Sequence, residues 1–160
     1  MDYSLIIRSA KKEDAKDIQD VLKVSFAEYI KYSGIENPVS VEAMSESLAE
    51  IEADIERCDV FIAKIDGKPV GTVRVSLLSE STAILTRLGV VPGHHNIGIG
   101  KSLMNLVDKV IVSKQVKTLQ LYTAARNTDI MRFYYGRGFY VDSTTKDRGY
   151  IRALMIKHYR

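Results

Sequence analysis

The sequence predicts one α+β domain, residues 1–160, in which a mixed, mostly antiparallel β-sheet carries helices. Three observations lead to this fold class. Two short β-rich runs flank an Asp66-Gly67 pair, and the hydrophobic period lengthens from two residues to between three and four after Pro92. No linker, repeat or low-complexity tract interrupts the chain. The expected element order is β-α-α-β-β-β-α-β-α-β-β, and 46% hydrophobic with 27% charged side chains suits one substantial core.

The first third of the chain predicts a strand at 5–8 and two helices. A cap-and-acid segment at 9–14 starts the first helix, whose apolar positions from 13 to 30 recur at three- and four-residue steps. That face is expected in the core and comprises Ala15, Ile18, Val21, Leu22, Ser25, Phe26 and Tyr29. The segment 33–38 breaks the helix, and we expect Ser40 to cap a second one with apolar positions at 41, 44, 48, 51 and 55.

The middle of the chain predicts three antiparallel strands. The runs 60–65 and 70–75 flank 66–69, where Asp66-Gly67 can supply the positive φ angles of a tight hairpin. A third extended run at 83–91 follows a polar turn and joins the same sheet.

After Pro92 the sequence predicts two helices and three more strands. Apolar residues at 99, 103, 106, 107, 110 and 111 describe a helix from Gly98 to Lys114. We then expect a strand at 118–123, a helix at 128–137, and closing strands at 139–143 and 151–157.

Charge and cysteine content restrict the function classes. The formal net charge of +3 suits a polyanionic small ligand, but Lys and Arg are scattered and give no support to nucleic-acid binding. No run approaches about 18 apolar residues, so no membrane partner is expected, and the N-terminus lacks the basic leader of a signal peptide. The single cysteine, Cys58, is interpreted as a small buried filler and fits a reducing, cytoplasmic location.

The segment from His95 to Lys101 is the strongest chemical feature. It lies before an amphipathic helix, whose first amides lack partners and attract phosphate oxygens. Gly98 and Gly100 let a ligand approach the backbone, and Lys101 can add a charge. A Walker-type loop is excluded because His95 replaces its first glycine, and a dinucleotide fingerprint because Leu103 replaces its third. Taken alone, the two glycines fit a loop-shaping role equally well.

Two segments together resemble the GCN5-related N-acetyltransferase (GNAT) superfamily. Residues 88–101 are similar to its acetyl-CoA-binding motif, with His95 where Gln or Arg is usual. Residues 127–139 are similar to its second motif, an Asn, a helix with an aromatic pair and a closing Gly138-Phe139. The resemblance implies a GNAT-like fold, acetyl-CoA as co-substrate and N-acetyltransferase activity.

The resemblance also implies roles for individual residues. The segment Leu88, Gly89 and Val90 would bind pantetheine. Main-chain groups of Leu88 and Val90 would hold it as they would hold an additional strand. Pyrophosphate would contact the segment His95, Asn96, Ile97, Gly98, Ile99, Gly100 and Lys101. Asn127 would contact the cofactor, cap a helix, or do both.

Tyr134 resembles the general acid that protonates the departing thiolate. A tyrosine, with an ordinary pKa of about 10, keeps its proton at neutral pH and can donate it. The alternative is a core tyrosine, because Tyr134 shares a helical face with Ile130 and Phe133. Tyr135 is a backup donor with a more structural character.

No general base is assigned. Some family members carry a glutamate where Tyr122 stands, and Glu28 and Glu80 are more readily surface charges. A water relay is equally compatible. We expect no metal, because His94 and His95 are adjacent and His158 stands alone.

The leading hypothesis is direct transfer of an acetyl group to a primary amine of a small molecule or peptide within a ternary complex. Its rivals are a noncatalytic acyl-CoA-binding or regulatory module and a nucleotide phosphate-binding protein. The sequence leaves open the amine, the range of acyl groups and the oligomeric state, a homodimer included.

Overall fold

The structure, a computed structural model, describes residues 4–94 and 97–160 and contains one seven-stranded sheet. The strands are β1 (Leu5–Ser9), β2 (Asp59–Ile65), β3 (Lys68–Leu77), β4 (Thr82–Val90), β5 (Thr118–Ala124), β6 (Tyr140–Thr145) and β7 (Arg152–His158). The helices are α1 (Ala15–Lys31), α2 (Leu48–Arg57), α3 (Ile99–Ser113) and α4 (Thr128–Gly136), with short 3-10 turns η1 (Lys12–Asp14), η2 (Pro38–Ser40) and η3 (Glu42–Met44). This order of helices and strands confirms the predicted one.

The sheet is mostly antiparallel, as predicted. Its spatial order is β1-β2-β3-β4-β5-β7-β6, and only the β4–β5 pair is parallel. The predicted tight hairpin forms, with Asp66 and Gly67 as its two loop residues at φ angles of 49° and 83°. Lys68 and Pro69, which we expected in the turn, already pair with β2.

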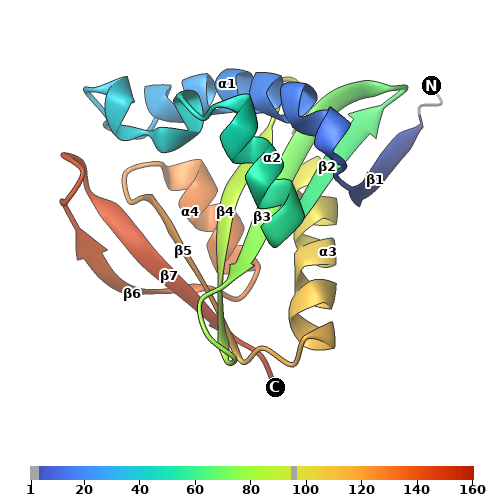
Figure 1. The fold of residues 1–160 in the computed structure, drawn as a ribbon. Coiled ribbons are helices and arrows are strands. Elements are labelled where there is room, and N and C mark those ends of the chain that lie inside the picture. The colour runs from blue at the N-terminus through green and yellow to red at the C-terminus, as the bar shows by residue number, and fades with distance from the viewer. Residues whose placement is uncertain (1–3, 95–96) are drawn as a thin grey trace.

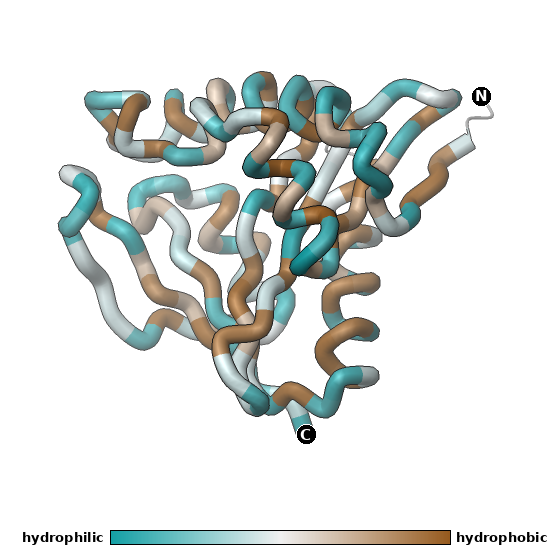
Figure 2. The backbone as a smooth tube through the Cα atoms, viewed as in Figure 1, coloured by the Kyte–Doolittle hydropathy of each residue, from teal (hydrophilic) through white to brown (hydrophobic). Residues whose placement is uncertain are grey.

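Helices cover both faces of the sheet (Figure 1). On one face α1 and α2 bury a small cluster that includes Ile18, Leu22 and Ile51. On the other, α3 and α4 contribute to a larger core that includes Leu103 and Tyr134. Figure 2 shows brown, hydrophobic segments alternating with teal ones along these helices, as the sequence periods predict.

The predicted start of the second helix is wrong. Ser40 lies in η2, and its hydroxyl donates to the Asn37 carbonyl at 2.7 Å. The helix begins at Leu48, where Ser47 Oγ accepts from Glu50 N at 3.1 Å and Glu50 Oε1 accepts from Ser47 N at 3.2 Å. This reciprocal capping box satisfies two end amides, so it outweighs a single serine further upstream.

Within the described residues, every helix is too short or too polar to cross a bilayer. This finding agrees with the absence of a long apolar run in the sequence.

Candidate functional site

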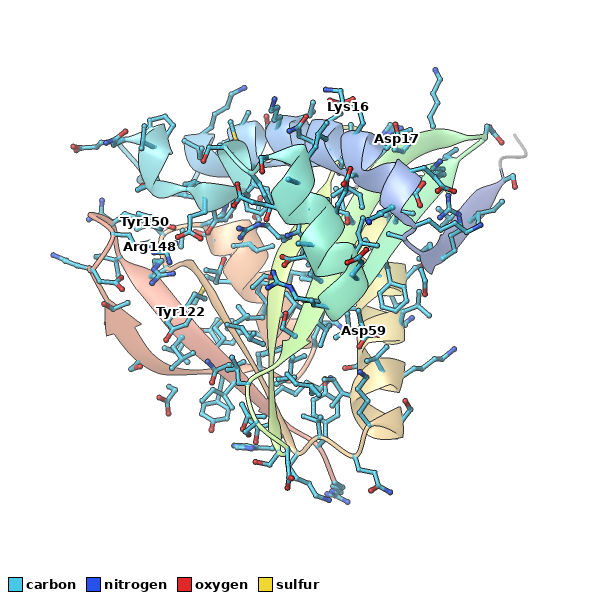
Figure 3. All side chains as sticks on the ribbon, in the orientation of Figure 1. Lys16, Asp17, Asp59, Tyr122, Arg148 and Tyr150 are labelled. Atoms are coloured by element: carbon cyan, nitrogen blue, oxygen red, sulfur yellow. The ribbon has the colours of Figure 1, made fainter. Side chains whose placement is uncertain are left out.

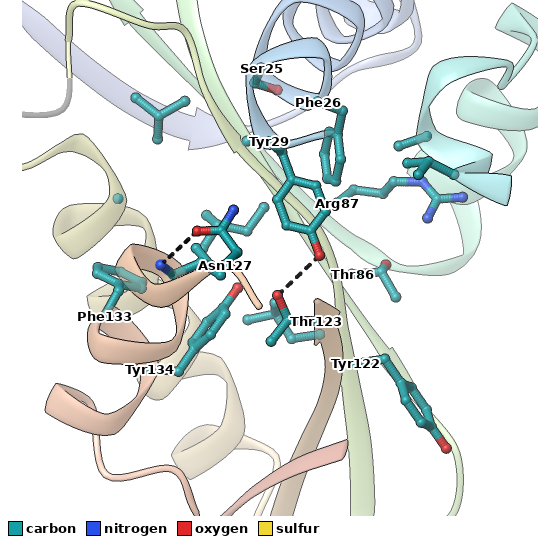
Figure 4. A pocket seen from close by; sticks show the side chains of 18 of the residues that line it. Ser25, Phe26, Tyr29, Thr86, Arg87, Tyr122, Thr123, Asn127, Phe133 and Tyr134 are labelled. Carbon is teal, nitrogen blue, oxygen red and sulfur yellow. Dashed lines mark hydrogen bonds between the residues drawn. The ribbon is translucent and has the colours of Figure 1, made fainter. Parts of the chain in front are cut away.

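A cavity opens where β4 and β5 diverge. The two strands pair only between Thr82–Ile84 and Thr118–Gln120, although β4 continues to Val90 and β5 to Ala124. The space between the diverging strands is a cavity of about 870 Å³ lined by both strands and by α1, α3 and α4 (Figure 4). The divergence therefore leaves two strand edges facing a ligand-sized volume.

The end of β4 presents main-chain groups to this cavity. Val91 N donates to Val70 O at 2.8 Å, so residue 91 forms a hydrogen-bonded pair with β3. Antiparallel pairs alternate, and the amide and carbonyl of Val90 therefore point to the opposite edge, toward β5. Leu88 precedes Val90 by two residues and shares this direction. Leu88, Gly89 and Val90 all line the cavity.

Gly89 has a packing role that the sequence did not reveal. A Cβ atom at this position would lie 2.3 Å from Ser25 Oγ and 3.1 Å from Ser25 Cβ. The glycine therefore lets α1 cross β4 closely, whatever contacts its main chain makes with a ligand.

The first turn of α3 supplies amides that have no hydrogen-bond partner among the described residues. Gly98, with φ of 76°, is the N-cap, and Ser102 N makes the first hydrogen bond of the helix to Gly98 O at 2.9 Å. The amides of residues 99–101 precede that bond and have no partner in the helix. Gly98, Gly100 and Lys101 line the cavity, so this positive helix end faces it.

Two predicted members of the pyrophosphate segment, Ile97 and Ile99, differ in placement from those three. Ile97 is exposed and the Ile99 side chain is fully buried in the core, and neither lines the cavity. His95 and Asn96 lie outside the described residues.

Asn127 caps α4, as one of its two predicted roles requires. Its Oδ1 accepts from Ile130 N at 3.2 Å, and its Nδ2 donates to Ser33 Oγ at 3.2 Å. Ser33 Oγ in turn donates to the Tyr29 carbonyl. The buried amide thus joins the end of α1 to the start of α4 beside the cavity.

Tyr134 is buried but lines the cavity. Only 4% of the residue is exposed, and its ring makes edge contacts with Phe133 and Phe139, with centroids 5.4 and 5.5 Å apart. Among the described residues, its hydroxyl forms no hydrogen bond, and Figure 4 shows it directed toward Asn127 and Tyr29. Burial, with a smaller effect from Tyr29, raises the pKa of Tyr134 well above its ordinary value, so the hydroxyl stays protonated at neutral pH.

Tyr29 is a site residue that the sequence placed in the core. Its hydroxyl accepts from Ala124 N at 2.6 Å and lies 3.3 Å from Thr123 Oγ1 (Figure 4). Both partners belong to the part of β5 that has diverged from β4. Burial raises the pKa of Tyr29 despite these bonds. Its position on the apolar face of α1 gave no signal that it would bind a strand end.

A group of charged and aromatic side chains lines the cavity on the side away from α3. Arg148 Nη1 lies 3.0 Å and Arg87 Nη2 3.8 Å from the two carboxylate oxygens of Glu42. The guanidinium of Arg152 stacks 4.5 Å from the ring centroid of Tyr122. Figure 3 labels Arg148, Tyr122 and Tyr150 on the β5–β7 side of the molecule, and all line the cavity.

The carboxylates considered as bases occupy different places. Glu28 lines the cavity from α1 and lies 3.5 Å from Lys31 Nζ, whereas Glu80 is an exposed turn residue outside the cavity lining. Tyr122 holds its predicted position on β5 and is 42% exposed. Residues 4–94 and 97–160 contain no cluster of three metal-ligating side chains. Cys58 is half-buried, and Ser76 Oγ donates to its sulfur at 3.1 Å.

Known proteins resemble this chain in sequence or in structure. A spermidine N(1)-acetyltransferase from Thermoplasma acidophilum is 25% identical over 88% of this chain and 91% of its own length. The crystal structure of PaiA N-acetyltransferase from Thermoplasma acidophilum in complex with coenzyme A superimposes with a TM-score of 0.86 at 24% identity, covering 98% of this chain and 99% of that one. A GNAT-family acetyltransferase from Streptococcus pneumoniae gives a TM-score of 0.75 at 18% identity, with 98% and 100% covered.

The family itself follows from a match over most of the chain. Residues 27–139 match the acetyltransferase (GNAT) family, and they include α3, α4 and both diverging strands. The chain therefore belongs to the acetyltransferase (GNAT) family.

Proposed function

We propose that this protein transfers the acetyl group of acetyl-CoA to a primary amine, with both substrates held in the cavity between β4 and β5. The observation that carries the proposal is a single cavity lined by a free strand edge, a helix N-terminus and a protonated tyrosine. The relative named as a spermidine N(1)-acetyltransferase supports an amine as the acceptor.

The described residues fit acetyl-CoA at two points. The outward main-chain groups of Leu88 and Val90 can pair with the amides of pantetheine, as a neighbouring strand would. The unpaired amides at 99–101 and the Lys101 side chain can hold pyrophosphate oxygens. Together these contacts direct the thioester toward Tyr134.

The chemistry is one acyl transfer without a covalent enzyme intermediate. The neutral amine nitrogen forms a bond to the thioester carbonyl carbon, and the carbon–sulfur bond breaks. The amine loses one proton to cavity water, and Tyr134 donates one to the departing sulfur, giving an amide and the free thiol. Solvent then reprotonates the Tyr134 oxygen, so atoms and charge balance.

Tyr134→Phe tests this role. We expect kcat to fall by about 10²- to 10⁴-fold, with acetyl-CoA affinity nearly unchanged, because the ring packing stays and only the proton donor is lost. Tyr135→Phe is the matched control, since Tyr135 on the same helix is 52% exposed and lies outside the cavity lining, away from the place of a backup donor. Thiol release over an amine panel and calorimetric titration with acetyl-CoA measure the two quantities.

The outcomes separate the proposal from its rivals. Unchanged turnover in Tyr134→Phe removes that residue from the mechanism. Acetyl-CoA binding by the unmodified protein without turnover on any amine supports a noncatalytic module. Stabilisation by ATP and not by acetyl-CoA supports a nucleotide-binding protein.

A further inference from the structure

We propose that the acceptor amine also carries a carboxylate, and that Arg87, Arg148 and Arg152 bind it. This inference rests on the proposed function, because it assigns the substrate class of the same cavity. The three residues come from β4, from the β6–β7 connection and from β7, and all line the cavity. Three guanidinium groups that line one cavity from separate elements form a wall suited to an anion.

Arg87 occupies a backbone position that normally favours glycine. Its φ of 57° falls at a bulge in β4, where the pairing skips from Thr72↔Gly89 to Arg74↔Thr86. Residues other than glycine rarely adopt this backbone conformation at a bulge, so an arginine at this position has a conformational cost. From this bulge Arg87 lines the cavity, and its side chain is 20% exposed.

Two of these arginines retain an unused donor. Within the described residues, the buried Nε atoms of Arg87 and Arg152 have no hydrogen-bond partner. The Nε atoms of Arg74 and Arg137 share this property, but neither residue lines the cavity. The Nε atoms are too buried for direct contact with a ligand, and a carboxylate in the cavity would accept from the Nη groups, which a planar guanidinium can present in bidentate fashion. Stacking on Tyr122 fixes the plane of Arg152 for such a contact.

In the lining at this end of the cavity guanidinium groups outnumber carboxylates, although each arginine has a carboxylate partner. Glu42 is the carboxylate that lines the cavity beside the arginines, it is 61% exposed, and Arg87 and Arg148 share it. Glu46 lies 3.6 Å from Arg87 but already accepts two hydrogen bonds from Arg74. Asp147, the partner of Arg152, lies outside the lining. The cavity wall therefore carries more guanidinium than carboxylate.

Carboxylates elsewhere in the lining do not contact this cluster. Glu28 on α1 lies near Lys31, and Asp129 belongs to the first turn of α4. Neither forms an ion pair with the three arginines. A diamine would bring a second positive charge toward this cluster, whereas an amino acid would bring a compensating negative charge. We expect the protein to prefer the latter.

Matched amine pairs test the preference. Initial rates of thiol release are measured with L-lysine against cadaverine and with L-ornithine against putrescine, which differ by one carboxylate. A second arm compares the amidated peptides Asp-Glu-Gly and Asn-Gln-Gly, so a peptide source of the same carboxylate chemistry is distinguished from a free amino acid. We expect kcat/KM to be at least about ten-fold higher for the carboxylate-bearing member of the pair that fits.

Arg148→Gln tests the assignment to this cluster. Arg148 is half-exposed on a loop, so the variant is expected to fold. The KM for the preferred carboxylate-bearing amine should rise about ten-fold with kcat nearly constant, and the KM for the matched carboxylate-free amine should not rise. Lys146→Gln, an exposed positive charge on the same loop outside the cavity lining, should behave as the unmodified protein.

The failures are distinguishable. If diamines or spermidine are acetylated as fast as amino acids or the acidic peptide, the carboxylate assignment is overturned. The proposed acetyltransferase function is then unaffected. An equal rise in KM for both members of a pair also overturns it. No acetyl-CoA consumption with any amine overturns the proposed function itself.

Discussion

The two ends of the cavity are built from different kinds of groups. Near α3, the end of β4 with the main chain of Leu88 and Val90 and the helix start at Gly98, Gly100 and Lys101 line the space. At the other end side chains line the space, among them Arg148 and, as Figure 4 labels them, Arg87 and Tyr122. A main-chain site depends on backbone shape, whereas a side-chain site depends on which residues meet. The first end therefore suits a ligand common to a whole family, and the second can change between members.

The side-chain end also depends on a buried support. Arg74 is 1% exposed and donates to Glu46 at 2.7 and 2.5 Å and to Asp54 at 2.9 Å. Glu46 lies beside Arg87, so this network stands directly behind the cavity wall. The main-chain end has no comparable charged support among its described contacts.

Glu46→Gln should give the largest effect on stability. Removing this charge leaves Asp54 as the remaining carboxylate partner of the buried Arg74, and we expect the free energy of unfolding to fall by about 3 kcal/mol, the lower end of the range for a broken buried ion pair. Urea unfolding followed by circular dichroism measures this loss. Glu36→Gln, the same change at an exposed position, should alter stability by less than about 0.5 kcal/mol.

The same variant separates the two ends kinetically. Because Arg87 loses a neighbouring carboxylate, the KM for the amine should change, while affinity for acetyl-CoA should stay close to that of the unmodified protein. A loss below about 1 kcal/mol, or equal effects on both ligands, contradicts this division of the cavity.

Asp14 gives a smaller, pH-dependent effect away from the cavity. A hydrogen bond from Arg8, with Nη1 at 2.7 Å, is the main reason that the pKa of Asp14 falls to about 2, and the Lys11 amide adds to it. The unfolded value is about 3.9. The stabilisation is therefore fully present above about pH 4 and is lost as the pH falls through about 2.

Asp14→Asn measures this contribution. At pH 6 the free energy of unfolding of the variant should be about 2 kcal/mol lower than that of the unmodified protein, and this difference should shrink between pH 4 and pH 2. Urea unfolding across this range provides the test, and a difference that stays constant with pH would contradict it. Above pH 5 Asp14 stays ionised, so ligand affinities can be compared there without an effect from its titration.

A main-chain site is easier to recognise in a sequence than a side-chain site, for a physical reason. Residues 88–101 are contiguous, and a strand followed by a glycine-containing helix start is visible as a local pattern. Glu42, Tyr122 and Arg148 are remote from one another in the chain, and their meeting depends on how β5, β7 and η3 pack. No local period reports such a meeting.

Tertiary contacts also decided the cases where local reading was incomplete or wrong. Tyr29 has the spacing of a core residue, yet its hydroxyl accepts from the Ala124 amide because β5 no longer pairs with β4 there. Ser40 resembles a helix cap, but Ser47 with Glu50 provides two capping bonds. The order of elements, by contrast, follows from hydrophobic periods that each segment carries by itself.

Two glycines provide the finest test of the main-chain end. At Gly100, a Cβ atom would lie 3.6 Å from Phe133 Cζ, an ordinary contact, so Gly100→Ala should keep or raise stability by up to about 1 kcal/mol. That Cβ would occupy cavity space beside the unpaired amides of α3, and acetyl-CoA should bind about ten-fold more weakly. At Gly89, a Cβ atom would meet Ser25 Oγ at 2.3 Å, so Gly89→Ala should cost about 1–3 kcal/mol of stability. Thermal unfolding and calorimetric titration of the two variants measure these opposite patterns. Undiminished acetyl-CoA affinity in Gly100→Ala would mean that no phosphate approaches this turn closely.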